Sequence, residues 1–392
     1  MLFPSENMDF WKVENEEYKI TIKWKHKYFE DYKKLSYDFY VCGFNTFNEV
    51  IYNANDHTKT DMWFLTGIFL IRHSIELGLK ALLCRVCKKN RDIQDLFINC
   101  CHNLSLLYQK YLEINDEKFL SKEEKEWLGK YLASLEIVDE KSDMFRFPFE
   151  DDFLAKYRDK FLDIVDVANN LLQAFSLVKK IIENGNIDEE DEFDDKLTPD
   201  FFVFTTHGIG NCYLWQSPTD RGFYVKVNGY IPVIDYIYNH SDIDNETKLY
   251  PMIFMFRNTI ELCLKRLLFS NVEKGVPINI AYAKRKSHLI KKDLWKNVKP
   301  VILYYAKEQG SDIGIINNAE KQLDVISSTD KTGDNFRYPT SYSLEYKIDN
   351  IDLDFKNVYE YLKSIINFLD SCDSMLDAIS EYENEMRSYV EW

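Results

Sequence analysis

Two segments of the chain each carry an arginine, a glutamate and a lysine at intervals of four residues. The first is FLIRHSIELGLKALL, and the second, 185 residues later, is FMFRNTIELCLKRLL. On a helix this spacing aligns the three side chains along one face as a charged ladder. The neighbouring positions are almost all apolar, so we expect each ladder to lie on a central helix that is packed on most sides. The ladder residues are Arg72, Glu76 and Lys80 in the first segment and Arg257, Glu261 and Lys265 in the second.

The ladders belong to a longer internal repeat. His102 follows Lys80 by 22 residues, and His288 follows Lys265 by 23. Further on, DEKSDMFRFP matches DKTGDNFRYP, so that Arg146 and Arg337 each stand seven residues after the first aspartate. Each copy then ends in a long amphipathic pattern. Matched landmarks in the same order indicate a duplication of the chain.

The repeat defines the expected domains. We predict an N-terminal repeat over residues 1–182, an acidic linker over 183–200 and a C-terminal repeat over 201–392. Residues 183–195 hold eight carboxylates in thirteen positions, which is typical of a solvated linker. Runs with strand composition, 18–24 and 201–206, precede the copies, and the rest has helical periodicity with breaks expected at Pro148, Pro251 and Pro339. The predicted fold class is all-α with short strands before each repeat.

The composition restricts the kinds of partner that the protein can bind and the cellular compartment in which we expect it. The 392 residues include 49 Lys and Arg against 65 Asp and Glu, a net charge of −16, so a contact with nucleic acid requires a local basic patch. No apolar stretch predicts a signal peptide or a membrane span. The eight cysteines are unevenly spaced, which favours reduced thiols. We therefore expect a cytoplasmic protein without membrane association.

Two interpretations of the ladders are open. In the first, arginine and lysine neutralise a partly buried glutamate, and the histidine and the FRFP or FRYP arginine join a network that is needed for folding. In the second, the two ladders meet across a pseudo-twofold axis and form one polar cleft that binds or cleaves a ligand.

The ordered motifs resemble those of HEPN domains, which are small helical bundles. The resemblance rests on E-x-x-L-K-x-L-L at Glu76 and Glu261, on the turn that begins at His102 or His288, and on R-[FY]-P at Arg146 and Arg337. It covers residues from about 36 to 180 and from about 220 to 378. The resemblance implies two tandem HEPN-like bundles that form an intramolecular pseudo-dimer.

The resemblance also implies a function. Many HEPN proteins belong to prokaryotic defence or toxin systems and cleave RNA without a metal through an R-x(4–6)-H motif. The pairs Arg72-His73 and Arg257-Asn258 look like the first half of this motif, whereas positions 77–79 and 262–264 lack its histidine. An RNA-binding protein or metal-independent ribonuclease is therefore one hypothesis. The alternative is a catalytically silent HEPN pair that serves as a protein-interaction or sensor module, and an enzyme acting on a nucleotide or another small ligand is a third.

The candidate site follows from these hypotheses. We expect no cofactor and no metal, because Cys84 and Cys87 have no cysteine counterparts in the second copy. The expected partners are RNA or a nucleotide and a second protein of a multi-component system, and further oligomerisation is open. The candidate catalytic residues are Arg72, His73, Glu76, Arg257, Asn258 and Glu261. The supporting residues are Lys80, Lys265, His102, His288, Arg146 and Arg337, together with the basic cluster Lys284, Arg285 and Lys286, which either contacts RNA phosphates or is a solvated loop.

Overall fold

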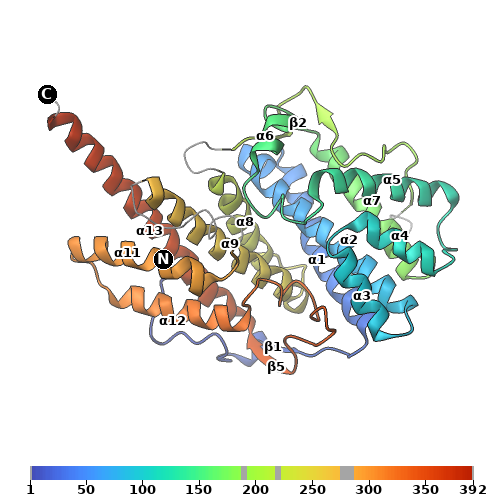
Figure 1. Ribbon diagram of the computed structural model, residues 1–392, viewed down its shortest axis with the longest axis horizontal. Helices are drawn as coiled ribbons and strands as arrows, with labels where there is room; N and C mark the ends of the chain where they lie inside the picture. The colour runs from blue at the N-terminus through green and yellow to red at the C-terminus, as the bar shows by residue number, and fades with distance from the viewer. Residues whose placement is uncertain (1, 187–191, 217–221, 274–286, 391–392) are drawn as a thin grey trace. The chain divides into compact units, whose positions relative to one another are not determined.

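Helices dominate the structure, a computed structural model that describes residues 2–186, 192–216, 222–273 and 287–390 (Figure 1). The strands within these ranges are short, and the longest, β1 (Lys19–Ile22) and β5 (Ile351–Asp354), have four residues each. The all-α class predicted from the periodicity is therefore confirmed. None of the helices in these ranges has an apolar stretch long enough to cross a bilayer.

The chain forms two compact units whose boundaries differ from those of the sequence repeats. Unit 1 comprises Met1–Ile20, Ile253–Asp334 and Asp352–Trp392, and unit 2 comprises Thr21–Met252 and Asn335–Ile351. Unit 2 therefore holds most of the first repeat, the beginning of the second, and the short segment that contains the FRYP motif.

Unit 2 is built around helix α2, on which every residue from Phe64 to Leu83 is buried. Helices α1, α4, α7 and α8 pack against α2. On α8, a Cβ at Gly229 would lie 2.7 Å from the backbone oxygen of Met62, so α8 and the π-helical turn η2 are in close contact. The helices of unit 2 are α1 (Tyr28–Tyr52), η2 (Lys59–Trp63), α2 (Phe64–Val86), α3 (Asn90–Cys100), α4 (Leu104–Ile114), α5 (Lys122–Asp139), α6 (Asp151–Tyr157), α7 (Ile164–Ile182) and α8 (Phe223–Asn239).

A small antiparallel sheet joins the segment that follows the acidic linker to the rest of unit 2. Its central strand is β2 (Phe161–Leu162), which pairs with β3 (Phe204–Thr205) on one side and with β4 (Cys212–Tyr213) on the other. Strands β1 and β3 lie within the runs 18–24 and 201–206, so the short strands expected before each repeat are present.

Unit 1 consists of helices from the second repeat and of the N-terminal segment. Helix α9 (Asn245–Glu273) enters unit 1 at Ile253 and carries the second ladder. Strands β1 and β5 pair with each other. The remaining elements are the 3₁₀ turn η1 (Glu16–Tyr18), the π-helical turn η4 (Ile290–Trp295), α11 (Lys296–Glu308), α12 (Gly314–Thr329) and α13 (Phe355–Val390).

The helix break expected at Pro251 is wrong. Pro251 lies inside α9, which begins six residues earlier at Asn245. At this position the proline removes one hydrogen bond, to the carbonyl in the first turn. The apolar residues that follow Pro251 are buried, and their packing favours a continuous helix despite that loss.

A substitution at Gly78 tests the close packing around α2. A Cβ at Gly78 would lie 2.8 Å from Cγ1 of Val178 on α7 and 3.3 Å from Oγ of Ser36 on α1. We predict that Gly78→Ala lowers the free energy of unfolding by about 1–3 kcal/mol because it overpacks the core. The control Gly129→Ala, on α5, meets no atom within 4 Å and should raise that free energy by about 0.5–1 kcal/mol. Urea unfolding measures both, and a shift of the same sign would contradict the packing of α2.

Candidate functional site

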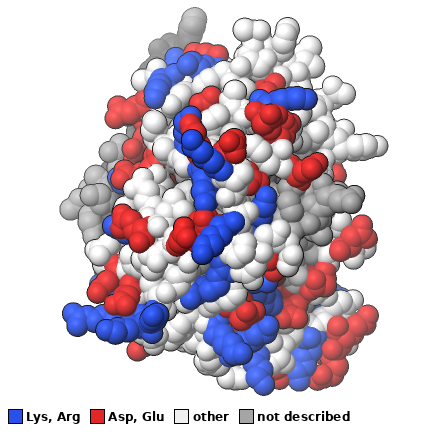
Figure 2. Space-filling view, turned by 90° about the vertical axis from the view of Figure 1, so that its right-hand side faces the viewer, with Lys and Arg blue, Asp and Glu red and all other residues white. Residues whose placement is uncertain are grey.

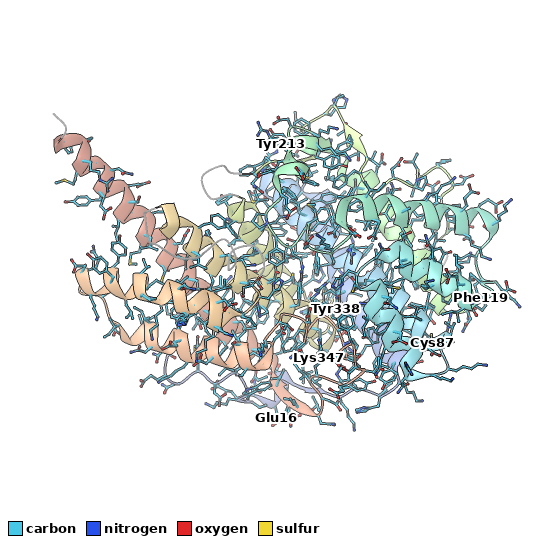
Figure 3. The ribbon with its side chains drawn as sticks, in the orientation of Figure 1. Glu16, Cys87, Phe119, Tyr213, Tyr338 and Lys347 are labelled. Carbon is cyan, nitrogen blue, oxygen red and sulfur yellow. The ribbon has the colours of Figure 1, made fainter. Side chains whose placement is uncertain are left out.

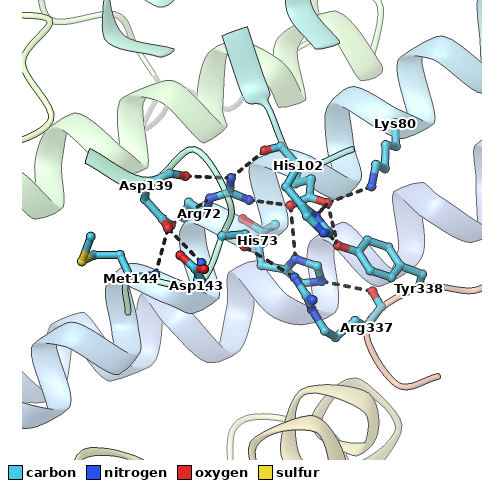
Figure 4. Close-up of polar contacts among 12 residues, drawn as sticks. Arg72, His73, Lys80, His102, Asp139, Asp143, Met144, Arg337 and Tyr338 are labelled. Atoms are coloured by element: carbon cyan, nitrogen blue, oxygen red, sulfur yellow. Dashed lines mark hydrogen bonds and ion pairs between the residues drawn. The ribbon is translucent and has the colours of Figure 1, made fainter. Parts of the chain in front are cut away.

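The carboxylate of Glu76 is the centre of a buried polar network in unit 2 (Figure 4). Its Oε1 accepts hydrogen bonds from Nζ of Lys80 at 2.8 Å, from Nδ1 of His102 at 3.0 Å and from the hydroxyl of Tyr338 at 2.6 Å. Its Oε2 accepts a hydrogen bond from Nη1 of Arg72. Burial raises the pKa of Glu76, but Lys80, His102 and His73 outweigh it and hold the pKa well below its usual value, so the group is ionised.

Arg72 connects three segments of the chain and is 0% exposed. Besides its bond to Glu76, Nη2 donates to the backbone oxygen of His102 at 2.6 Å and to that of Asp139 at 3.4 Å. Its Nε lies 3.3 Å from Oδ2 of Asp139. The guanidinium is therefore committed to protein acceptors, and this geometry is that of a structural arginine rather than of one that contacts a substrate.

Asp139 orders the turn that follows α5. Its Oδ1 accepts the backbone N–H groups of Asp143 at 2.9 Å and Met144 at 3.0 Å. Burial raises the pKa of Asp139 from its usual value, while the nearby Arg72 lowers it. Asp139 is the aspartate seven residues before the FRFP arginine, and its position in the repeated block was the sequence signal that could have placed it in the site.

His102 is the member of the network that reaches the surface, with 23% of its side chain exposed. Because the ionised Glu76 can only accept, Nδ1 of His102 carries the hydrogen, and the lone pair of a neutral ring is on Nε2. Burial lowers the pKa of His102 from its usual value, against the opposing effect of Glu76. A carboxylate that orients an imidazole in this way leaves Nε2 able to accept a proton.

His73 follows Arg72 on α2 and is fully buried, with Nδ1 3.9 Å from Oε2 of Glu76. Its Nε2 is 3.0 Å from the backbone oxygen of Arg337, which can only accept, so Nε2 carries the hydrogen. Burial lowers the pKa of His73 to about 3, and the ring is therefore neutral at physiological pH.

Tyr338 completes the site, although sequence reasoning did not include it. Tyr338 and Lys347 lie close together in the segment between α12 and β5 (Figure 3), which belongs to unit 2. Nζ of Lys80 lies 4.3 Å from the centre of the Tyr338 ring, in addition to the hydroxyl bond to Glu76. The only signal was the tyrosine in FRYP, where the first copy has Phe147 without a hydroxyl. The FRYP segment of the second repeat thus contributes to the first ladder.

Unit 1 contains the same network a second time, on α9. Nη1 of Arg257 donates to Glu261 at 3.0 Å, and Nζ of Lys265 and Nδ1 of His288 contact Oε1 of Glu261 at 2.7 and 3.0 Å. Arg257 also donates to the backbone oxygens of His288 at 2.6 Å and Asp330 at 3.3 Å. The side chain of His288 is 40% exposed. In both copies the glutamate is bound by the arginine, the lysine and the histidine, and the arginine is bound to the backbone of the histidine, so this part of the network is a property of the repeated sequence.

The remaining candidates lie elsewhere. The guanidinium carbon of Arg146 is 5.0 Å from the centre of the Phe147 ring. Asn258 is buried next to Arg257 on α9. Lys284, Arg285 and Lys286 fall outside the described residues. Within the described ranges, no group of three or more His, Cys, Asp or Glu side chains could hold a metal ion.

Comparison with known proteins adds no assignment: no family model, curated protein or solved structure matches this chain.

Removal of the central carboxylate tests the burial of the network. We predict that Glu76→Ala lowers the free energy of unfolding on the order of 3 kcal/mol, because Arg72 and Lys80 would be left buried without their common partner. Glu261→Ala should have a comparable effect in unit 1. The control Glu126→Ala removes an exposed i,i+4 pair with Lys130 on α5 and should leave the melting curve unchanged. A wild-type melting temperature for Glu76→Ala would show that the ladder is solvated.

The lowered pKa of His73 predicts a pH dependence of stability. Below pH 6.5 the unfolded chain protonates this histidine while the folded chain does not, so protonation favours unfolding. The wild type should lose about 1.4 kcal/mol per pH unit from this group as the pH falls from 6.5 towards 3. His73→Asn, the residue of the second copy, should lack this contribution. Urea unfolding of both proteins from pH 7 to 4 measures the difference, and parallel pH curves would contradict the assignment.

Proposed function

We propose that this chain is a pair of HEPN-like bundles from a prokaryotic defence or toxin-type system that acts by binding, as a protein-interaction or sensor module. One observation carries the proposal. In both copies the arginine of the expected nuclease motif is buried and bound to a glutamate and to two backbone oxygens.

The geometry of Arg72 and Arg257 bears directly on RNA cleavage. To stabilise the charge of a transition state, a guanidinium must reach the phosphate with free donors. Arg72 and Arg257 would have to break several buried bonds and leave an uncompensated glutamate behind. A role in holding the histidine turn and the aspartate turn on the ladder helix accounts for these hydrogen bonds and ion pairs of the two arginines without a substrate.

The surface charge does not favour non-specific electrostatic binding of RNA and agrees with binding of another kind of partner. The net charge of −16 repels a phosphate backbone at long range. Figure 2 shows the side on which α3, α4 and α5 lie in Figure 1, and blue and red side chains are interspersed there rather than separated into one basic field.

A metal-independent ribonuclease is the second candidate, and one observation favours it. The pairs Glu76–His102 and Glu261–His288 each hold an imidazole by Nδ1, while part of the ring is exposed. An imidazole oriented in this way can take the proton of a ribose 2′-hydroxyl, a role that the expected motif assigns to its missing histidine.

Cleavage assays separate the two candidates. We predict that the purified full chain leaves labelled single-stranded and hairpin RNA intact over hours, with or without chelator. Expressed together with the protein encoded next to it, the chain should form a stoichiometric complex, as measured by size-exclusion chromatography with light scattering.

The contrary result has a clear signature. Cleavage that persists in chelator and is lost in His102→Ala plus His288→Ala, but not in the exposed-histidine control His207→Ala, would establish the ribonuclease. Unchanged melting of the double variant is required for that conclusion, because both histidines also contact buried carboxylates.

A further inference from the structure

We infer that the C-terminal end of α13 from one copy of this chain docks into a lysine-lined groove on unit 1 of a second copy. The groove lies between the η4–α11 helix and α12 and has a volume of about 790 Å³. Both surfaces belong to unit 1 and lie outside the buried networks, so the inference does not depend on the proposed function.

The groove combines an apolar floor with a basic rim. Leu289, Trp295, Pro300 and Leu303 provide its apolar lining. The charged lining consists of five lysines, one glutamate and one aspartate, a net charge of +3 on a chain of net charge −16. The lysines are Lys291, Lys292, Lys296, Lys299 and Lys331.

Only part of this positive charge is neutralised within the groove. Lys291 pairs with Asp324, and Lys299 pairs with Glu320 at 2.5 Å, so two ion pairs connect the walls. The other three lysines, Lys292, Lys296 and Lys331, are exposed and form no ion pair within the part of the chain that the structure describes. A groove of this kind fits an apolar surface flanked by carboxylates.

The first repeat shows that the fold does not require Lys292 or Lys331. When the repeats are aligned on their histidines, Lys292 corresponds to Leu106. When they are aligned on the aspartates that bind the ladder arginines, Lys331 corresponds to Glu140. By the histidine alignment Lys296 corresponds to Lys110, so two of the three unpaired lysines are particular to the second repeat.

The end of α13 has the complementary surface. The last buried residue of this helix is Leu376, and residues 381–389 are all exposed. Figure 1 shows this end projecting beyond α11 and α12 of the same unit. Ile379, Tyr382, Met386 and Tyr389 are spaced by three, four and three residues, which places them in one stripe along the helix.

Charge and length both match the groove. Residues 377–390 contain four acidic side chains and one arginine, a net charge of −3 against the +3 of the groove lining. The acidic residues are Asp377, Glu381, Glu383 and Glu385. The stripe spans about 15 Å, and the groove wall from Lys292 to Leu303 spans about 16 Å at the rise of a helix.

A second copy must supply the helix. Residues 381–389 are exposed, so they do not occupy the groove of their own copy. An amphipathic helix that lays its apolar stripe into a groove between two helices is a common mode of recognition. Reciprocal docking of two copies would bury both exposed surfaces at once.

Charge reversal in the full chain tests the inference. Analytical ultracentrifugation over a concentration series should show a self-associating wild type. Lys296→Glu plus Lys331→Glu, in the groove, should weaken association at least about tenfold. The control Lys307→Glu plus Lys321→Glu changes exposed lysines of α11 and α12 that do not line the groove, and it should associate like the wild type.

A complementary variant identifies the occupant. Glu381→Lys plus Glu385→Lys, on α13, should also weaken self-association, and mixing this protein with the groove variant should restore it, because each groove then meets a helix of opposite charge. A monomeric wild type, equal effects of the groove and control variants, or failure of the mixture to associate would overturn the inference. Loss of association on changing Tyr382 and Met386 to serine, with no effect of the groove variant, would show that α13 pairs elsewhere and would also overturn it.

Discussion

One buried carboxylate in each copy determines the arrangement around it. Glu76 and Glu261 each accept bonds from an arginine and a lysine of the same helix and from a histidine further along the chain. A buried cation without a partner is very costly, so the arginine and lysine require the glutamate. The arginine in turn binds the backbone of the histidine turn and of the aspartate turn. The loops around each ladder helix are therefore positioned by charge neutralisation as well as by apolar packing.

The two networks are alike in their charged residues and differ in the groups that surround them. In unit 2 the first ladder receives the Tyr338 hydroxyl, whereas the matching residue of the first repeat is Phe147. The residue after the ladder arginine is His73 in one copy and Asn258 in the other. The hydroxyl gives Glu76 one more donor, and the buried histidine adds a group that resists protonation. The copies have thus kept the interactions needed for folding while their surroundings diverged.

Burial distinguishes the residues that hold the network together from the histidines that could transfer a proton. The arginine, glutamate and lysine have at most a few per cent of their side chains exposed in both copies, whereas the histidine reaches the surface. Any proton transfer at these sites would therefore pass through His102 or His288, with the glutamate as a positioning group. Binding of large partners would use other surfaces, of which the basic groove on unit 1 and the exposed end of α13 are the most distinctive.

The sequence by itself determined the helical class, the repeat, the ladders and the membership of His102 and His288 in the networks. These features follow from local spacing, because residues four apart on a helix face each other and an apolar helix must be buried. The spacing of the aspartate in DEKSDMFRFP was visible too, but its bond to Arg72 depends on how the turn after α5 folds back. Only the tertiary structure decided that the Arg337-Tyr338 segment of the second repeat reaches the first ladder. Such long-range contacts are set by packing between segments more than 200 residues apart, for which a single sequence contains no periodic signal.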